Sequence, residues 1–182
     1  MAHIDLGVDE NEFPGVRGPL KYRPVTGKPM LELAETLLRG PLSLSTADRE
    51  LIAAYVSGLN QCTYCCAAHS AFAAALLDEG MPLVEQVRTD PDNAPVSTKL
   101  RALLHIAGAV QRSGRDVTPE LVETARAEGA TDEEIHDTVL IAAAFCMVNR
   151  YVDGLGTFAP SDPTFYEEAA RRVLSVGYRN TV

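Results

Sequence analysis

The chain has 182 residues, enough for one domain with a real hydrophobic core and too few to require two. It is 46% hydrophobic and 23% charged, and its formal net charge of −9 argues against a nucleic-acid surface and against a polybasic patch for anionic membranes. No apolar run approaches the roughly 20 residues that span a bilayer, and residues 1–24 lack the basic and apolar regions of a signal peptide. We therefore expect a cytoplasmic protein, in which close cysteines indicate redox chemistry or metal binding rather than a permanent disulfide.

The N-terminal segment, residues 1–28, is rich in Pro and Gly and lacks helical periodicity. We predict an extended arm that lies on the body of the protein or on a neighbouring subunit, followed by a helical domain over residues 29–182. From Met30 onward, apolar residues recur at helical spacing, and no stretch shows the alternation of β-branched residues that is typical of a strand. The predicted fold is all-α, a single-domain bundle of about six to seven helices.

Capping signals set the expected limits of the helices. Ser45, with Asp48 three residues later, predicts a helix start, and Asn60 predicts the N-cap of the next helix. Thr118 is followed by a proline at the first helical position, and Thr131 caps a long helix. The predicted helices cover residues 30–40, 45–57, 60–77, 100–110, 118–129, 131–155 and 164–176.

Four potential nucleophiles or ligands lie within eight residues of the third predicted helix: Cys62, Cys65, Cys66 and His69. Because successive helical residues rotate by about 100°, Cys62, Cys65 and His69 share one face, and Cys66 lies at its edge. Thiols at positions i and i+3 can form a disulfide with little backbone movement. With Asn60 as the N-cap, Cys62 lies in the first turn, where the helix N-terminus and a nearby imidazole favour the thiolate.

Glu50 stands twelve positions before Cys62, on the preceding predicted helix. Its neighbours on that face are small and let another helix approach closely; they are Ala53, Ala54 and Ser57. Glu50 could therefore reach the cysteine-bearing helix and pair with His69. Without that spacing, a glutamate on a helix is more often a solvated charge.

Together, Glu50, Cys62, Cys65 and His69 resemble the core motif of the alkylhydroperoxidase D-like family, within the carboxymuconolactone decarboxylase-like superfamily. The family pattern is Glu, eleven residues, Cys, two residues, Cys, three residues and His, and all four positions match. The segment 145–156 is also similar to a later helix of the family. The resemblance implies an all-α fold that assembles as a homo-oligomer, either a trimer or a hexamer.

The resemblance further implies a peroxidase, an oxidoreductase that reduces hydroperoxides with thiols. Cys65 would be the peroxidatic thiol, which attacks the hydroperoxide and becomes a sulfenic acid. Cys62 would supply a proton and then resolve the sulfenic acid as a Cys62–Cys65 disulfide, while Glu50 and His69 would relay the proton from Cys65. No cofactor or metal is implied. The expected partners are the hydroperoxide and a thiol reductant, which could be a lipoyl domain, a thioredoxin-like protein or a small thiol.

Tyr64 departs from the family pattern, whose best-studied branch has a second His immediately before the second Cys. Because a Tyr titrates near pH 10, it cannot replace an imidazole as a base near neutrality. The same dithiol therefore also fits a second hypothesis, a non-enzymatic redox sensor or adaptor whose assembly or partner binding changes on oxidation. The paired cysteines argue against decarboxylation or lactone chemistry, which is the superfamily's other branch.

Alternatives remain open for several of these residues. The cysteines and His69 could bind zinc, although one helix face does not easily surround an ion, or they could fill a core as buried thiols. Cys66 is interpreted as a packing residue or a spectator, and Cys146 lies on an apolar stripe that favours core packing. Arg150 and Asp153 form either a local ion pair or part of the active pocket or of a subunit contact.

Overall fold

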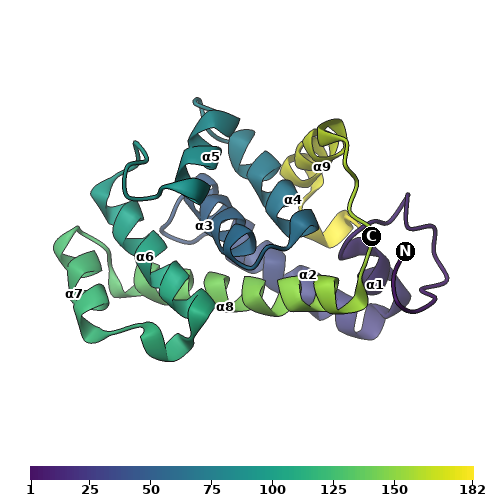
Figure 1. Ribbon diagram of the computed structural model, residues 1–182, viewed down its shortest axis with the longest axis horizontal. Helices are drawn as coiled ribbons and strands as arrows, with labels where there is room; N and C mark the ends of the chain where they lie inside the picture. The colour runs from purple at the N-terminus through teal and green to yellow at the C-terminus, as the bar shows by residue number, and fades with distance from the viewer.

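Helices are the only regular secondary structure in the computed structural model, which describes residues 1–182 (Figure 1). The all-α prediction is confirmed, but the chain forms nine α-helices instead of six to seven. In chain order the elements are α1 (Arg17–Tyr22), α2 (Pro24–Arg39), α3 (Thr46–Leu59), α4 (Thr63–Ala74), α5 (Met81–Thr89), α6 (Thr98–Arg112), the 3-10 turn η1 (Gly114–Asp116), α7 (Pro119–Ala127), α8 (Asp132–Leu155), α9 (Pro163–Val176) and the 3-10 turn η2 (Tyr178–Asn180).

The N-terminal segment is only partly the extended arm that was predicted. Helix α1 lies within residues 1–28, and α2 begins at Pro24 rather than at Met30. A proline in the first turn of a helix leaves no lost hydrogen bond, so the Pro content of this segment does not prevent helix formation. The residues before α1 lie against the end of α8, where the His3 amide donates to the Leu155 carbonyl at 2.7 Å (Figure 1).

Helix α5 was not predicted, because it is short and follows directly after the turn that closes α4. Its nine residues bury three apolar side chains, those of Leu83, Val84 and Val87. Three buried residues that span little more than one helical turn give too weak a periodic pattern to indicate a helix from the sequence. The helix packs against both α3 and α4, and it carries Arg88 to the back of the cysteine-bearing helix.

Helices α3 and α4 form a hairpin at the centre of the molecule, and α3 also packs against α6 and α8 (Figure 1). Every residue of α3 from Arg49 to Ser57 is buried. The small side chains Ala53, Ala54 and Ser57 let α4 and α8 approach closely, as the sequence indicated. Burying a glutamate in such a helix requires hydrogen-bonding partners, and Glu50 has them.

The turn between α3 and α4 differs from the prediction. Asn60 caps the C-terminus of α3, and Cys62 is the N-cap of α4, so Cys62 precedes the first turn instead of lying in it. Gln61 has a φ of 59°, and the Cys62 and Gln61 amides donate to the carbonyls of Ser57 and Gly58. This hydrogen-bond pattern closes a helix through one left-handed residue, a position that usually holds glycine.

Helix α8 begins with the predicted cap, in which the Thr131 side chain and Glu134 exchange hydrogen bonds with each other's backbone amides. The helix is 24 residues long, and an 18-residue stretch of it has a mean hydropathy of 1.3. By length and composition alone, α8 could therefore cross a membrane. The helix itself was predicted over residues 131–155, but no possible membrane span was, because polar residues interrupt its apolar run. One such helix is a weak indication of a membrane span, and α8 packs against α3 and α6 as a core helix does.

Candidate active site

Glu50 and His69 form a buried pair between α3 and α4. The Glu50 Oε2 atom lies 2.7 Å from the His69 Nδ1 atom, and the two residues are 1% and 7% exposed. The structure therefore places Glu50 against the cysteine-bearing helix, as the spacing suggested. A carboxylate at this distance holds the proton of the imidazole on Nδ1 and leaves Nε2 free to accept another.

Tyr178 is the second partner of Glu50 and was not found from the sequence. Its hydroxyl donates to the other carboxylate oxygen of Glu50 at 2.6 Å. Burial, the nearby Glu50 charge and this hydrogen bond raise the pKa of Tyr178 well above its ordinary value. Tyr178 comes from η2, near the end of the chain, so no local pattern links it to a glutamate in α3.

Aromatic rings enclose the imidazole on several sides. The His69 ring meets the Phe145 and Phe72 rings nearly edge-on, with centroids 4.4 Å and 5.3 Å away. The Tyr178 ring lies roughly parallel to it at 6.3 Å. These contacts fix the ring plane and keep water from the hydrogen bond to Glu50, which strengthens that bond.

Cys62 and Cys65 are both buried and both free thiols, and the structure brings them together. The neighbouring Cys65 side chain is the main reason that the pKa of Cys62 is raised, and burial is the next. The backbone amide of Cys65 acts in the opposite direction. At neutral pH Cys62 is therefore a thiol that can donate a proton towards Cys65.

Asp153 also lies beside Cys62, and its side chain contributes to raising the pKa of that thiol. The local ion pair considered for Arg150 and Asp153 is absent, because the Arg150 guanidinium donates to the Cys146 carbonyl at 2.9 Å instead. Asp153 thus belongs to the surroundings of the dithiol. Cys146 is partly buried and packs against the core, in line with the packing interpretation.

Two tyrosines, Tyr64 and Tyr166, lie near the dithiol. Burial and the nearby Cys65 and Cys62 raise the pKa of Tyr166 to about 12, and its hydroxyl donates to the Pro160 carbonyl at 2.8 Å. Burial also raises the pKa of Tyr64. Both side chains are therefore neutral phenols near pH 7. The N-terminal segment covers Tyr64 so closely that a Cβ on Gly15 would come within 2.2 Å of the ring.

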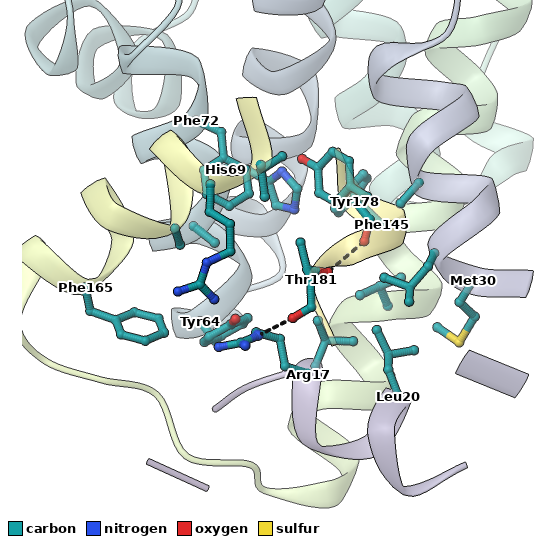
Figure 2. A pocket seen from close by; sticks show the side chains of 18 of the residues that line it. Arg17, Leu20, Met30, Tyr64, His69, Phe72, Phe145, Phe165, Tyr178 and Thr181 are labelled. Atoms are coloured by element: carbon teal, nitrogen blue, oxygen red, sulfur yellow. Dashed lines mark hydrogen bonds between the residues drawn. The ribbon is translucent and has the colours of Figure 1, made fainter. Parts of the chain in front are cut away.

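An apolar cavity of about 120 Å³ opens beside His69 (Figure 2). Tyr64, Ala68, His69 and Phe72 line it from α4, so it lies on the face of α4 that also carries Cys65. Arg17 lines the cavity near Tyr64, where its Nε donates to the Thr181 carbonyl at 2.9 Å (Figure 2). The walls are mostly apolar, but Arg17, Arg172 and Glu168 line the cavity as well as His69, so it suits an organic substrate that also carries a polar group.

Replacing Tyr178 by Phe tests the role of its hydroxyl in holding Glu50. The native state raises the pKa of Tyr178, so the stability that its phenol contributes is complete below about pH 10 and declines as the pH rises further. Tyr178→Phe keeps the ring but loses the hydrogen bond, and we expect unfolding free energy at pH 7 to fall by about 1–2 kcal/mol. Urea unfolding between pH 7 and pH 11 should show a shallower alkaline decline in the variant. An equally steep decline would contradict this assignment.

Residues 24–82 match the model of the carboxymuconolactone decarboxylase family. Among solved structures, a peroxidase-related protein from Silicibacter sp. TM1040 has 25% sequence identity and a TM-score of 0.76, covering 85% of this chain and 78% of its own. An alkylhydroperoxidase AhpD core protein from Ralstonia eutropha JMP134, also described as peroxidase-related, has 26% identity and a TM-score of 0.76, covering 87% and 81%. A protein of unknown function from Agrobacterium tumefaciens has 23% identity and a TM-score of 0.69, covering 79% and 97%. No curated protein sequence matches significantly.

Proposed function

We propose that this chain, which matches the carboxymuconolactone decarboxylase family model over residues 24–82 and has an alkylhydroperoxidase D-like fold, is a thiol-dependent hydroperoxide reductase. One observation carries the proposal: the buried Glu50–His69 pair, joined at 2.7 Å, lies one helical turn from the Cys62–Cys65 dithiol. A base held by a carboxylate next to two thiols is the arrangement that thiol-based nucleophilic catalysis needs.

In the first half of the reaction, His69 Nε2 accepts the proton of the Cys65 thiol, and the charge of Glu50 stabilises the imidazolium that forms. The Cys65 thiolate attacks the outer oxygen of the hydroperoxide, and the O–O bond breaks. The alkoxide leaves with the electron pair and takes a proton from His69 or from the Cys62 thiol. The products are an alcohol and a sulfenic acid on Cys65.

In the second half, the Cys62 sulfur attacks the Cys65 sulfur, a disulfide forms, and the hydroxyl leaves as water with the remaining proton. One hydroperoxide and two thiols thus give one alcohol, one water and one disulfide. The two cysteines are neighbours at positions i and i+3 at the start of α4, so resolution requires little movement of the backbone. Rapid resolution protects Cys65 from further oxidation.

Decarboxylation is the other chemistry found under the same family name. It does not require two thiols, and in this chain the buried base, Tyr64 and the apolar cavity lie along α4, the helix that carries Cys65 and begins at Cys62. Thiol chemistry is therefore the function that this arrangement supports best.

The direct test is to treat the reduced protein with one equivalent of an organic hydroperoxide, alkylate the remaining thiols, and locate the modified cysteines by mass spectrometry. We expect one alcohol per chain, a Cys62–Cys65 disulfide, and alkylated Cys66 and Cys146. Cys66 and Cys146 act as internal controls, because neither hydrogen-bonds with Glu50 or His69. If the peroxide is not consumed, or if the disulfide joins other cysteines, the proposal is wrong.

A further inference from the structure

Helix α4 separates two openings that lie on opposite faces of it. The apolar cavity is lined from α4 by Tyr64, Ala68, His69 and Phe72, whereas a second pocket is lined from α4 by Thr63, Cys66 and Ala67. With about 100° of rotation per residue, these two sets are centred on opposite sides of the helix. The cysteine-bearing helix is therefore approached from two directions.

The second pocket has a volume of about 350 Å³ and includes Cys62 among its lining residues, but not Cys65. Cys62 reaches it because, as the N-cap, it lies at the end of α4 rather than on the face of the apolar cavity. In an oxidised Cys62–Cys65 pair, Cys62 would be the sulfur that an incoming thiol in this pocket meets first. Asp153, the carboxylate beside Cys62, does not line the pocket.

Arg88 gives this pocket an uncompensated positive charge. Its guanidinium makes no ion pair and no hydrogen bond, and its Nε is buried without any partner. Arg88 and the Cys66 thiol both lie against Gly58. A Cβ added to that glycine would be 3.3 Å from Arg88 Nε and 3.6 Å from Cys66 Sγ. Leaving a buried guanidinium N–H unpaired is unfavourable, and a carboxylate would satisfy it in the geometry that arginine prefers.

Two further features favour an anion in the same place. No side chain caps the N-terminus of α4, so the first backbone amides of the helix keep their partial positive charge unpaired. This end of the helix lies at the pocket. Burial raises the pKa of the Cys66 thiol, while Arg88 and the Ser70 hydroxyl oppose this effect. Cys66 is therefore a neutral neighbour that leaves the charge of Arg88 available.

We propose that this pocket is the docking site of the reductant, and that the reductant is a small organic thiol carrying a carboxylate, which Arg88 binds. The inference rests on the proposed function, because it assumes that a Cys62–Cys65 disulfide forms. It assigns the two faces of α4 to the two substrates: the hydroperoxide enters beside His69, and the thiol enters beside Arg88. Both can then reach the dithiol without passing each other.

The reduction uses two molecules of the thiol. The first thiolate attacks Cys62 Sγ, the protein disulfide breaks, and Cys65 leaves as a thiolate with the electron pair and is reprotonated through His69. The second thiolate attacks the outer sulfur of the mixed disulfide on Cys62, and Cys62 leaves and takes up a proton. Two thiols are oxidised to one small disulfide, and the protein disulfide is reduced to two thiols.

The test starts from protein oxidised with diamide, so that it does not depend on peroxide turnover, with the Cys62–Cys65 linkage verified by mass spectrometry. Reduction rates are measured with 3-mercaptopropionate and with its neutral amide, each expressed per concentration of thiolate. For the wild-type chain we expect the carboxylate to react about 10-fold faster than the amide, since a charge-assisted hydrogen bond favours it. The ratio should fall to about 1 in Arg88→Gln and remain clearly above that value in Arg88→Lys.

Arg115→Gln is the matched control, because Arg115 is exposed, forms no ion pair and changes the net charge equally. A second variant, Thr63→Trp, fills the pocket from an exposed position and serves if Arg88→Gln does not fold. It should slow reduction by both thiols at least 10-fold.

Equal rates for the two thiols in the wild-type chain, or an unchanged ratio in Arg88→Gln, would overturn the inference. Normal reduction of Thr63→Trp would do the same. These failures are distinguishable from failure of the proposed function, in which hydroperoxide would not generate the disulfide although diamide does.

Discussion

Cys65→Ser is expected to lower hydroperoxide turnover by about 10³-fold or more, because the hydroxyl of serine is not ionised by an imidazole near neutral pH and is a far weaker nucleophile towards oxygen. The substitution is nearly isosteric at a site where Cys65 is 2% exposed, so the fold should persist. Peroxide consumption with a chemical thiol as reductant measures the loss, and circular dichroism verifies the helical content.

Cys62→Ser should behave differently, and the contrast identifies the roles of the two sulfurs. With Cys65 intact, we expect one equivalent of peroxide to be consumed and a sulfenic acid to accumulate on Cys65, detectable with dimedone. Cys146→Ser is the matched control, since Cys146 packs against the core and forms no hydrogen bond with Glu50 or His69, and its turnover should stay within about 2-fold of wild type. Sulfenic acid on Cys62 in the Cys65→Ser variant would reverse the assignment.

Glu50→Gln is expected to have the next largest effect, a loss of about 10²–10⁴-fold in kcat/KM. The carboxylate accepts from both His69 Nδ1 and the Tyr178 hydroxyl, and its charge favours the imidazolium that forms when Cys65 loses its proton. A neutral amide removes that charge. In one of its two orientations the amide also donates to Nδ1, which moves the ring proton to Nε2 and blocks acceptance from Cys65.

The pH profile separates this role from simple destabilisation. Hydroxide replaces a missing protein base more effectively as the pH rises, so the loss of oxidation rate in Glu50→Gln relative to the wild type should shrink above pH 7. Glu167→Gln is the control, since Glu167 is exposed on α9 and makes no ion pair, and its profile should match the wild type. A variant with normal rates at pH 7 would show that Glu50 is not part of the proton relay.

The helix limits illustrate how far local rules reach. Ser45, Thr118 and Thr131 each cap the helix that they were expected to cap, because a side-chain oxygen and an amide two or three residues later are a purely local pair. The prediction for Asn60 was wrong, although Asn is a good N-cap. Its side chain instead donates to Asn149 at 2.8 Å, a partner on α8 that no local pattern reveals.

For this protein, the sequence by itself determined the all-helical class, most of the caps and the spacing that places Glu50, Cys62, Cys65 and His69 within reach of one another. These features depend on residues one or a few helical turns apart, or on two helices joined by a short turn. Only the tertiary structure decided what surrounds them. Tyr178 on Glu50, Asp153 beside Cys62 and Arg88 behind α4 come from distant segments, and packing of whole helices brings them to the dithiol.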